Sequence, residues 1–180
     1  MSFLHHSEHD SPPRDIVVYG RAYTPDWNAD TPTVNVFKSE QMNSQLATDT
    51  KGLPVFIEHD DKYPIGEVVD AYIDESRNLN TFLYISGNDL VNRKLPDTLD
   101  PHPMTKKRFY SGLSMGTDVA LDQKSKCYTQ VVGVKPTEVS LVRNPDRPEA
   151  NIYDYWIVPR SSTDRDAFVS DLKERFDFHY

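Results

Sequence analysis

The stretch that decides the fold reads LPVFIEHDDKYPIGEVVDAYID and covers residues 53–74. Its apolar run at 54–57 is typical of a β-strand, and turn formers at 62–64 separate it from a second predicted strand at 65–70. His59 closely follows the first strand, where a rigid backbone would hold its imidazole within reach of solvent. This placement suits a general base, because imidazole titrates near neutral pH. On this stretch alone, a surface histidine in an acidic turn is the simpler interpretation.

The composition limits the class of protein. The chain has 180 residues, 37% hydrophobic and 27% charged, with a net charge of −8 and a pI near 5.2. We expect a disordered segment over 1–14 and a single domain over 15–180. The acidic balance argues against nucleic-acid binding through a basic face. No apolar run reaches the length of a membrane-spanning helix, and the N-terminus lacks the features of a signal peptide.

Metal, disulfide and cofactor chemistry find little support in the sequence. Cys127 is the only cysteine, so an intramolecular disulfide and a cysteine-based zinc site are excluded. Its place in a polar turn that enters a strand argues against a nucleophilic role. The run EHDD at 58–61 has metal-ligand residue types, but adjacent side chains on a strand point to opposite faces. Since phosphate-binding loop motifs are also missing from the sequence, we expect neither a metal nor a cofactor.

Short strands dominate the rest of the chain. Besides those at 54–57 and 65–70, the pattern predicts strands at 15–23, 33–37, 79–86, 117–121, 128–134, 138–142 and 152–158. Short helices are expected at 39–47, with Ser39 as N-cap, and at 88–95, before a proline-rich loop at 96–103. An amphipathic helix is expected at 163–176, where Phe168, Leu172 and Phe176 recur every four residues. The prediction is a mostly antiparallel, nearly closed β-barrel with peripheral helices.

Ser114 is the hydroxyl that best complements His59. It lies in GLSMGT at 112–117, where apolar neighbours would hold the backbone and glycines would let a substrate approach. A serine hydroxyl becomes a good nucleophile only when a base takes its proton. Ser111 is the second candidate, and a plain small residue in a barrel strand remains the simpler interpretation of Ser114.

Glu138 is the candidate third group, which would fix the tautomer of the imidazole and stabilise its charged form. It opens the predicted strand EVSLV at 138–142. The breaker-rich turn at 143–148 offers backbone N–H groups and two guanidinium groups, which suits an oxyanion hole. A solvated strand end and surface ion pairs are the simpler interpretations of these residues.

Taken in order, these segments resemble the capsid maturation proteases of herpesviruses, the assemblins, and the related prohead proteases of tailed phages. The similarity is carried by VVYGRAY at 17–23, LPVFIEHD with IGEVV at 53–69, GLSMG at 112–116 and EVSLV at 138–142. It implies a β-barrel of the assemblin type with a catalytic triad of His59, Ser114 and Glu138. It also suggests that the backbone N–H of Asp146 and the side chain of Arg147 stabilise the oxyanion.

Two positions depart from the family's pattern. Assemblins have a second histidine where this chain has Glu138, although phage-type relatives tolerate a carboxylate there. Assemblins also have adjacent arginines where this chain has Asp146 and Arg147. A carboxylate can orient an imidazole at least as well as a histidine can, so the triad remains chemically sound.

The resemblance implies a serine endopeptidase that cleaves the internal scaffold protein and its own precursor, in contact with capsid proteins. It also implies a homodimer formed through the C-terminal helix, inside immature capsids. These would lie in the host nucleus for a herpesvirus-like protein and in the host cytoplasm for a phage. The alternatives are a non-catalytic barrel that serves as a scaffold or interaction module of the capsid, and another serine hydrolase.

Overall fold

The computed structural model describes residues 14–25, 42–87, 94–125, 128–159, 162 and 164–175, with the backbone alone over 119–134. Several predictions lie outside these residues. They are the disordered segment before residue 14, the strand at 33–37, most of the helix at 88–95, and Cys127.

Seven strands of the described chain form one sheet. They are β1 (Ile16–Tyr23), β2 (Pro54–Ile57), β3 (Gly66–Ile73), β4 (Leu79–Ile85), β5 (Gly112–Ser125), β6 (Tyr128–Val142) and β7 (Ile152–Ile157). Their spatial order is β5-β6-β2-β3-β4-β1-β7. All neighbouring pairs are antiparallel except β2 and β6, which run parallel. The prediction of a mostly antiparallel β fold is confirmed.

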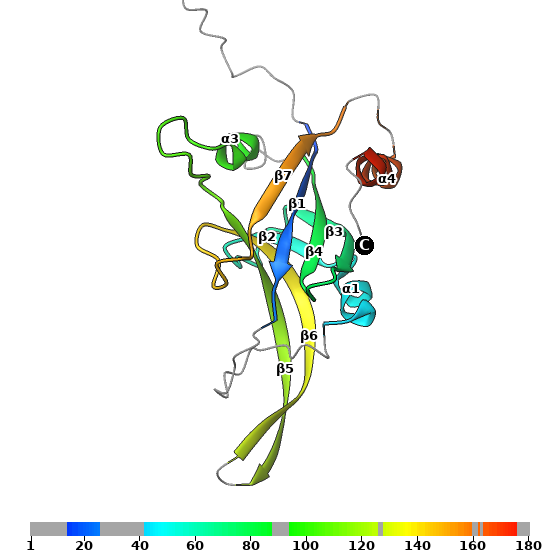
Figure 1. Cartoon of the computed structure of the whole chain (residues 1–180), viewed down its shortest axis with the longest axis vertical. Coiled ribbons are helices and arrows are strands. Elements are labelled where there is room, and N and C mark those ends of the chain that lie inside the picture. The colour runs from blue at the N-terminus through cyan, green and yellow to red at the C-terminus, as the bar shows by residue number, and fades with distance from the viewer. Residues whose placement is uncertain are drawn as a thin grey trace, which may run out of the picture.

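The sheet curls until its two outer strands meet at one point (Figure 1). There the Leu113 N–H donates to the Ala150 carbonyl at 3.0 Å, and the Ile152 N–H donates to the Ser111 carbonyl at 3.0 Å. Because this bridge joins only the start of β5 to the start of β7, the sheet is a half-barrel. The expectation of near closure is met only at this contact.

Alternation along each strand produces two apolar clusters on opposite faces of the sheet. On β1, Ile16 and Val18 belong to the larger cluster, which helices α1 (Ser44–Thr50) and α3 (Leu95–Leu99) also contact. Val17 and Tyr19 belong to the smaller cluster on the other face. Helix α4 (Arg165–Arg175) covers that second face (Figure 1).

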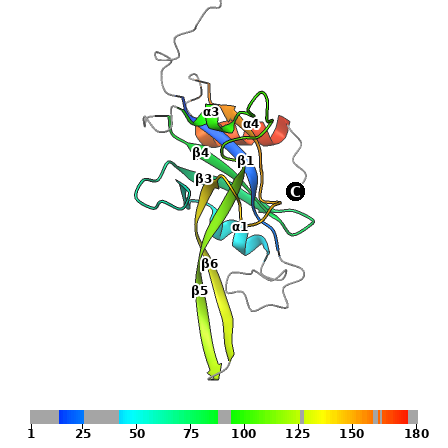
Figure 2. The same cartoon turned by 90° about the vertical axis from the view of Figure 1, so that its left-hand side faces the viewer.

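The longest strands form a ribbon that leaves the body of the protein. β5 and β6 pair from Gly112–Val142 out to Ser125–Tyr128, and their far half extends beyond the other strands in both views (Figures 1 and 2). The prediction of separate strands at 128–134 and 138–142 is wrong, because β6 continues through Pro136. Pro136 pairs with Thr117 where the register shifts, and such an irregularity tolerates a missing N–H.

The helices correct two further predictions. Helix α1, in the region predicted at 39–47, begins at Ser44, because the side chain of Asn43 caps it by accepting from the N–H groups of Gln45 and Leu46. Ser39, the predicted N-cap, lies outside the described residues. The predicted proline-rich loop begins instead with α3, since a proline is compatible with the first turn of a helix.

The structure confirms the helix predicted at 163–176, which runs from Arg165 to Arg175. Asp164 caps α4 by accepting from the N–H groups of Asp166 and Ala167. Its inner side consists of Val169 and Leu172, both buried, and the half-buried Phe168. Phe176 lies outside the described residues. None of the helices in the described ranges is long and apolar enough to span a bilayer.

Candidate active site

Strand β6, which carries Glu138, lies between β5, which carries Ser114, and β2, which ends shortly before His59. In the antiparallel β5–β6 ladder, Ser114 is opposite Ser140 and Gly116 is opposite Glu138. In the parallel β2–β6 ladder, Phe56 is opposite the same Ser140. Three segments that are distant in sequence therefore converge around the first half of the EVSLV segment.

His59 reaches this place through a tight turn at the end of β2. Glu58 and His59 both have positive φ angles, 50° and 60°, in the left-handed region that costs energy for residues other than glycine. Three hydrogen bonds hold the turn: Glu58 N–H to Leu141 O at 3.0 Å, His59 N–H to Ser140 Oγ at 3.2 Å, and Asp60 N–H to Ile57 O at 2.9 Å. The strain is thus offset by bonds to β6.

The three residues predicted as a triad lie in hydrogen-bond contact. His59 Nε2 is 3.0 Å from Ser114 Oγ, and His59 Nδ1 is 2.5 Å from Glu138 Oε1. A carboxylate only accepts, so in the neutral imidazole Nδ1 carries the proton and Nε2 is an acceptor facing Ser114. This is the tautomer in which an imidazole can take a proton from a serine hydroxyl.

The exposures of the pair fit a site that a substrate must enter. The side chain of His59 is 45% exposed, whereas that of Glu138 is 12% exposed. The imidazole is therefore accessible to solvent, while the carboxylate that holds it is largely shielded from water. Such shielding strengthens the electrostatic interaction between the two groups.

Ser140 is a residue at this site that was not predicted from the sequence. Its hydroxyl donates to Glu138 Oε2 at 2.6 Å and accepts the His59 backbone N–H at 3.2 Å, and the residue is fully buried. The available signal was a polar residue inside the apolar strand EVSLV, two positions from Glu138 and therefore on the same face. A buried hydroxyl must find partners, and here those partners are two triad residues.

Ser111, the second nucleophile candidate, has another partner. Its Oγ donates to the carbonyl oxygen of Arg143 at 2.8 Å. The N–H and Nε of Arg143 donate to Glu58 Oε1 at 2.8 and 3.3 Å, and its guanidinium lies 5.0 Å from the ring centroid of Phe109. Ser111 on one side and Glu58 on the other thus hold Arg143, at the start of the loop after β6. Of the two candidate serines, Ser114 is the one that contacts His59.

Asp146 and Arg147 lie farther along this loop. Arg147 Nη2 donates to the Tyr23 hydroxyl at 3.0 Å, and its guanidinium lies 4.5 Å from the centre of that ring. Asp146 is exposed, whereas Arg147 is half-buried. Within the described residues, no side-chain hydrogen bond joins either residue to His59, Ser114 or Glu138. In the structure the Arg147 side chain is hydrogen-bonded to Tyr23, and its part in an oxyanion hole stays a prediction.

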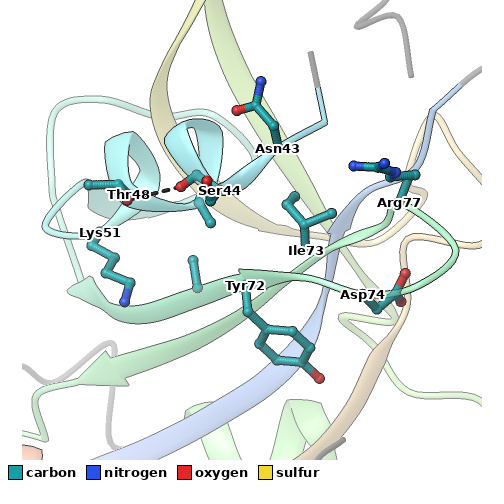
Figure 3. A pocket seen from close by; sticks show the side chains of 10 residues that line it. Asn43, Ser44, Thr48, Lys51, Tyr72, Ile73, Asp74 and Arg77 are labelled. Atoms are coloured by element: carbon teal, nitrogen blue, oxygen red, sulfur yellow. Dashed lines mark hydrogen bonds between the residues drawn. The ribbon is translucent and has the colours of Figure 1, made fainter. Parts of the chain in front are cut away.

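Two other features of the described chain bear on chemistry. A groove of about 560 Å³ lies between α1 and β3, with Lys51 at one end and Arg77 at the other, and no triad residue lines it (Figure 3). No group of three or more histidine, cysteine, aspartate or glutamate side chains in the described ranges is arranged to hold a metal ion.

The fold is shared with solved protease structures. Kaposi's sarcoma-associated herpesvirus protease bound to a hexapeptide phosphonate inhibitor matches with a TM-score of 0.53 and 17% identity, over 92% of this chain and 78% of that one. The same protease with an allosteric inhibitor, compound 733, matches at 0.53 and 15%, over 92% and 91%. With a dimer disruptor it matches at 0.53 and 16%, over 92% and 91%.

These likenesses show a common fold at low identity. No protein-family model matches the chain, and no curated protein matches it significantly.

Proposed function

We propose that this chain is a serine endopeptidase of viral capsid maturation, with Ser114 as nucleophile, His59 as general base and Glu138 as the group that orients His59. The observation that carries the proposal is the chain of contacts Ser114 Oγ–His59 Nε2–His59 Nδ1–Glu138 Oε1, at 3.0 and 2.5 Å. The shared fold with a herpesvirus protease supports the peptidase activity in this proposal.

The chemistry follows from the tautomer of His59. Ser114 Oγ attacks the scissile carbonyl carbon while its proton moves to His59 Nε2, and Glu138 stabilises the imidazolium that forms. His59 then returns the proton to the leaving amine, which frees the first product and leaves an acyl group on Ser114. A water molecule then attacks this ester while His59 takes its proton, and His59 gives that proton to Ser114 Oγ as the acyl product leaves as a carboxylic acid. We keep the Asp146 N–H and Arg147 as the oxyanion candidates, with Arg147 exchanging its Tyr23 contact for the substrate.

The proposed substrates are the internal scaffold protein and the chain's own precursor, within immature capsids and beside capsid proteins. A peptide-like inhibitor bound to the structurally similar protease agrees with a polypeptide substrate. Dimer disruptors of that protease agree with a homodimer for this chain. Because Val169 and Leu172 are buried in their own chain, a dimer formed through α4 would use the outer face of that helix.

A non-catalytic barrel explains the site less well. An interaction module has no need for a shielded carboxylate aligned on a strained histidine that faces a serine. Strain of this kind persists where surrounding contacts hold it, and it concentrates at functional sites. Another serine hydrolase would use the same three residues, so only its substrate would distinguish it from the proposed peptidase.

Labelling with a fluorophosphonate probe tests the nucleophile. We expect the wild-type protein to form a phosphorus–oxygen bond at Ser114 with loss of fluoride, as mass spectrometry of the peptides would show. Ser114→Ala should remove the label and Ser111→Ala should keep it. Label on Ser111, or an unlabelled wild type, would overturn the assignment. Co-expression with a scaffold protein then tests the substrate: cleavage by wild type and not by Ser114→Ala supports the peptidase, and labelling without cleavage points to another hydrolase.

A further inference from the structure

Ser140 connects two triad residues through one hydroxyl group. The hydroxyl hydrogen is directed to Glu138 Oε2 at 2.6 Å, and the oxygen accepts the backbone N–H of His59 at 3.2 Å. These two bonds use the donor and one acceptor position of the hydroxyl, and the residue has no exposed surface. Its orientation is therefore determined by the triad itself.

The position of Ser140 in the sheet explains why it can do this. It is opposite Ser114 on one side and opposite Phe56 on the other, so β6 carries it between the nucleophile strand and the strand that delivers His59. Alternation places Ser140 and Glu138 on the same face of β6. No other residue type of this size offers both a strong donor and an acceptor there.

We propose that Ser140 is a positioning residue of the catalytic site, which fixes the Glu138 carboxylate and the His59 turn with the same hydroxyl. By occupying Oε2, it leaves Oε1 directed at His59 Nδ1. By accepting from the His59 N–H, it supports a backbone conformation that is unfavourable without partners. The inference deepens the proposed peptidase function and rests on it.

The consequence is a loss of alignment when the hydroxyl is removed. Ser140→Ala leaves an oxygen of the largely shielded Glu138 carboxylate and the His59 backbone N–H without these partners, and each group must find another partner or move. Misplacement of a catalytic group by about 1 Å can slow a reaction by about 10²-fold. We expect Ser140→Ala to react with the fluorophosphonate probe about 10- to 100-fold more slowly than wild type, with Ser114 still the labelled residue.

A matched control separates positioning from general loss of stability. Thr81 is also fully buried, and its hydroxyl donates to the Gly20 carbonyl on the sheet, with no contact to the triad. Thr81→Val should lower the melting temperature as Ser140→Ala does, while the labelling rate stays within about twofold of wild type. Ser140→Cys, whose thiol is somewhat larger and donates only weakly, should react at an intermediate rate and serves if Ser140→Ala does not fold.

The ring proton of His59 gives a readout that a structural role would not change. In wild type the Nδ1–H held by Glu138 should give a low-field proton resonance, which we expect to move or broaden in Ser140→Ala and to stay in place in Thr81→Val. An unchanged labelling rate and resonance in a folded Ser140→Ala protein would overturn the inference. If wild type is not labelled at all, the proposed peptidase fails, and the resonance still decides whether Ser140 aligns the pair.

Discussion

Gly116 leaves the space in which the carboxyl group of Glu138, its partner across the β5–β6 ladder, lies. A Cβ atom at position 116 would be 2.7 Å from Glu138 Cγ and 2.8 Å from Cδ, closer than Cβ atoms approach other heavy atoms in real proteins. The side chain of Glu138 can therefore lie back across β5 toward His59 because residue 116 has no side chain. The requirement is one of space and not of backbone conformation.

Gly116→Ala should displace the Glu138 carboxylate and misalign His59. We expect the rate of fluorophosphonate labelling at Ser114 to fall by about 10²-fold in a protein that remains folded. The control is the same substitution in a Glu138→Ala background, where no carboxylate is left to displace and the further loss should be small. Equal losses in both backgrounds would show that Gly116 acts independently of Glu138.

The strand pattern of the core could be predicted from sequence because alternation and turn formers are local signals. The strands around His59 and the β3–β4 hairpin lie where the pattern places them. The errors lie where long-range pairing overrides a local signal. Pro136 is a breaker in the sequence, yet pairing with β5 carries β6 past it.

The candidate site was only partly accessible to the same reasoning. His59, Ser114 and Glu138 have residue types that indicate their chemistry, and the structure brings them into contact. The residue types of Ser140 and Gly116 do not indicate a role in catalysis. A buried serine and a strand glycine acquire such roles only from the residues that the fold places opposite them. Which residues support the triad depends on the register of strand pairing, and no local sequence pattern specifies that register.

Glu58 links two segments by hydrogen bonds: the turn that contains His59 and the loop that follows β6. Because its carboxylate accepts both the N–H and the Nε of Arg143, Glu58→Ala should loosen the turn and the loop together. We expect about 1 kcal/mol lower stability in urea unfolding and about tenfold slower labelling of Ser114. Glu58→Gln keeps an acceptor and should lie between wild type and Glu58→Ala. An unchanged labelling rate in Glu58→Ala would restrict this tether to a structural role.

Asp70 makes part of the stability depend on pH. Burial alone would raise the pKa of Asp70, but hydrogen bonds from Lys173 of α4 and from Lys51 lower it below its ordinary value of 3.8. A lowered folded-state pKa means that the stabilisation is complete above the ordinary value and is lost as the pH falls through the folded pKa. We therefore expect the free energy of unfolding to fall below about pH 4.

Asp70→Asn checks this origin of the pH dependence. The variant should be about 2 kcal/mol less stable than wild type at neutral pH, since two charge-assisted hydrogen bonds are weakened. Its stability should also fall less steeply than that of wild type between about pH 5 and about pH 3, because it lacks one carboxylate whose pKa differs between the folded and unfolded states. Urea unfolding at several pH values measures both quantities, and parallel curves for the two proteins would exclude Asp70 as the source.

A substitution at Leu172 tests whether the apolar side of α4 packs against its own chain or against a second copy. The residue is 3% exposed and packs with Val17, Phe82 and Val169 in the smaller apolar cluster. Leu172→Ala should destabilise the protein by about 2–3 kcal/mol and increase hydrogen exchange in α4, because a cavity opens beneath the helix. Ser170→Ala, on the exposed side, is the control and should change little. Equilibrium sedimentation should give the same oligomeric state for wild type and Leu172→Ala. A shift toward monomer in Leu172→Ala alone would assign this side of the helix to an interface between copies.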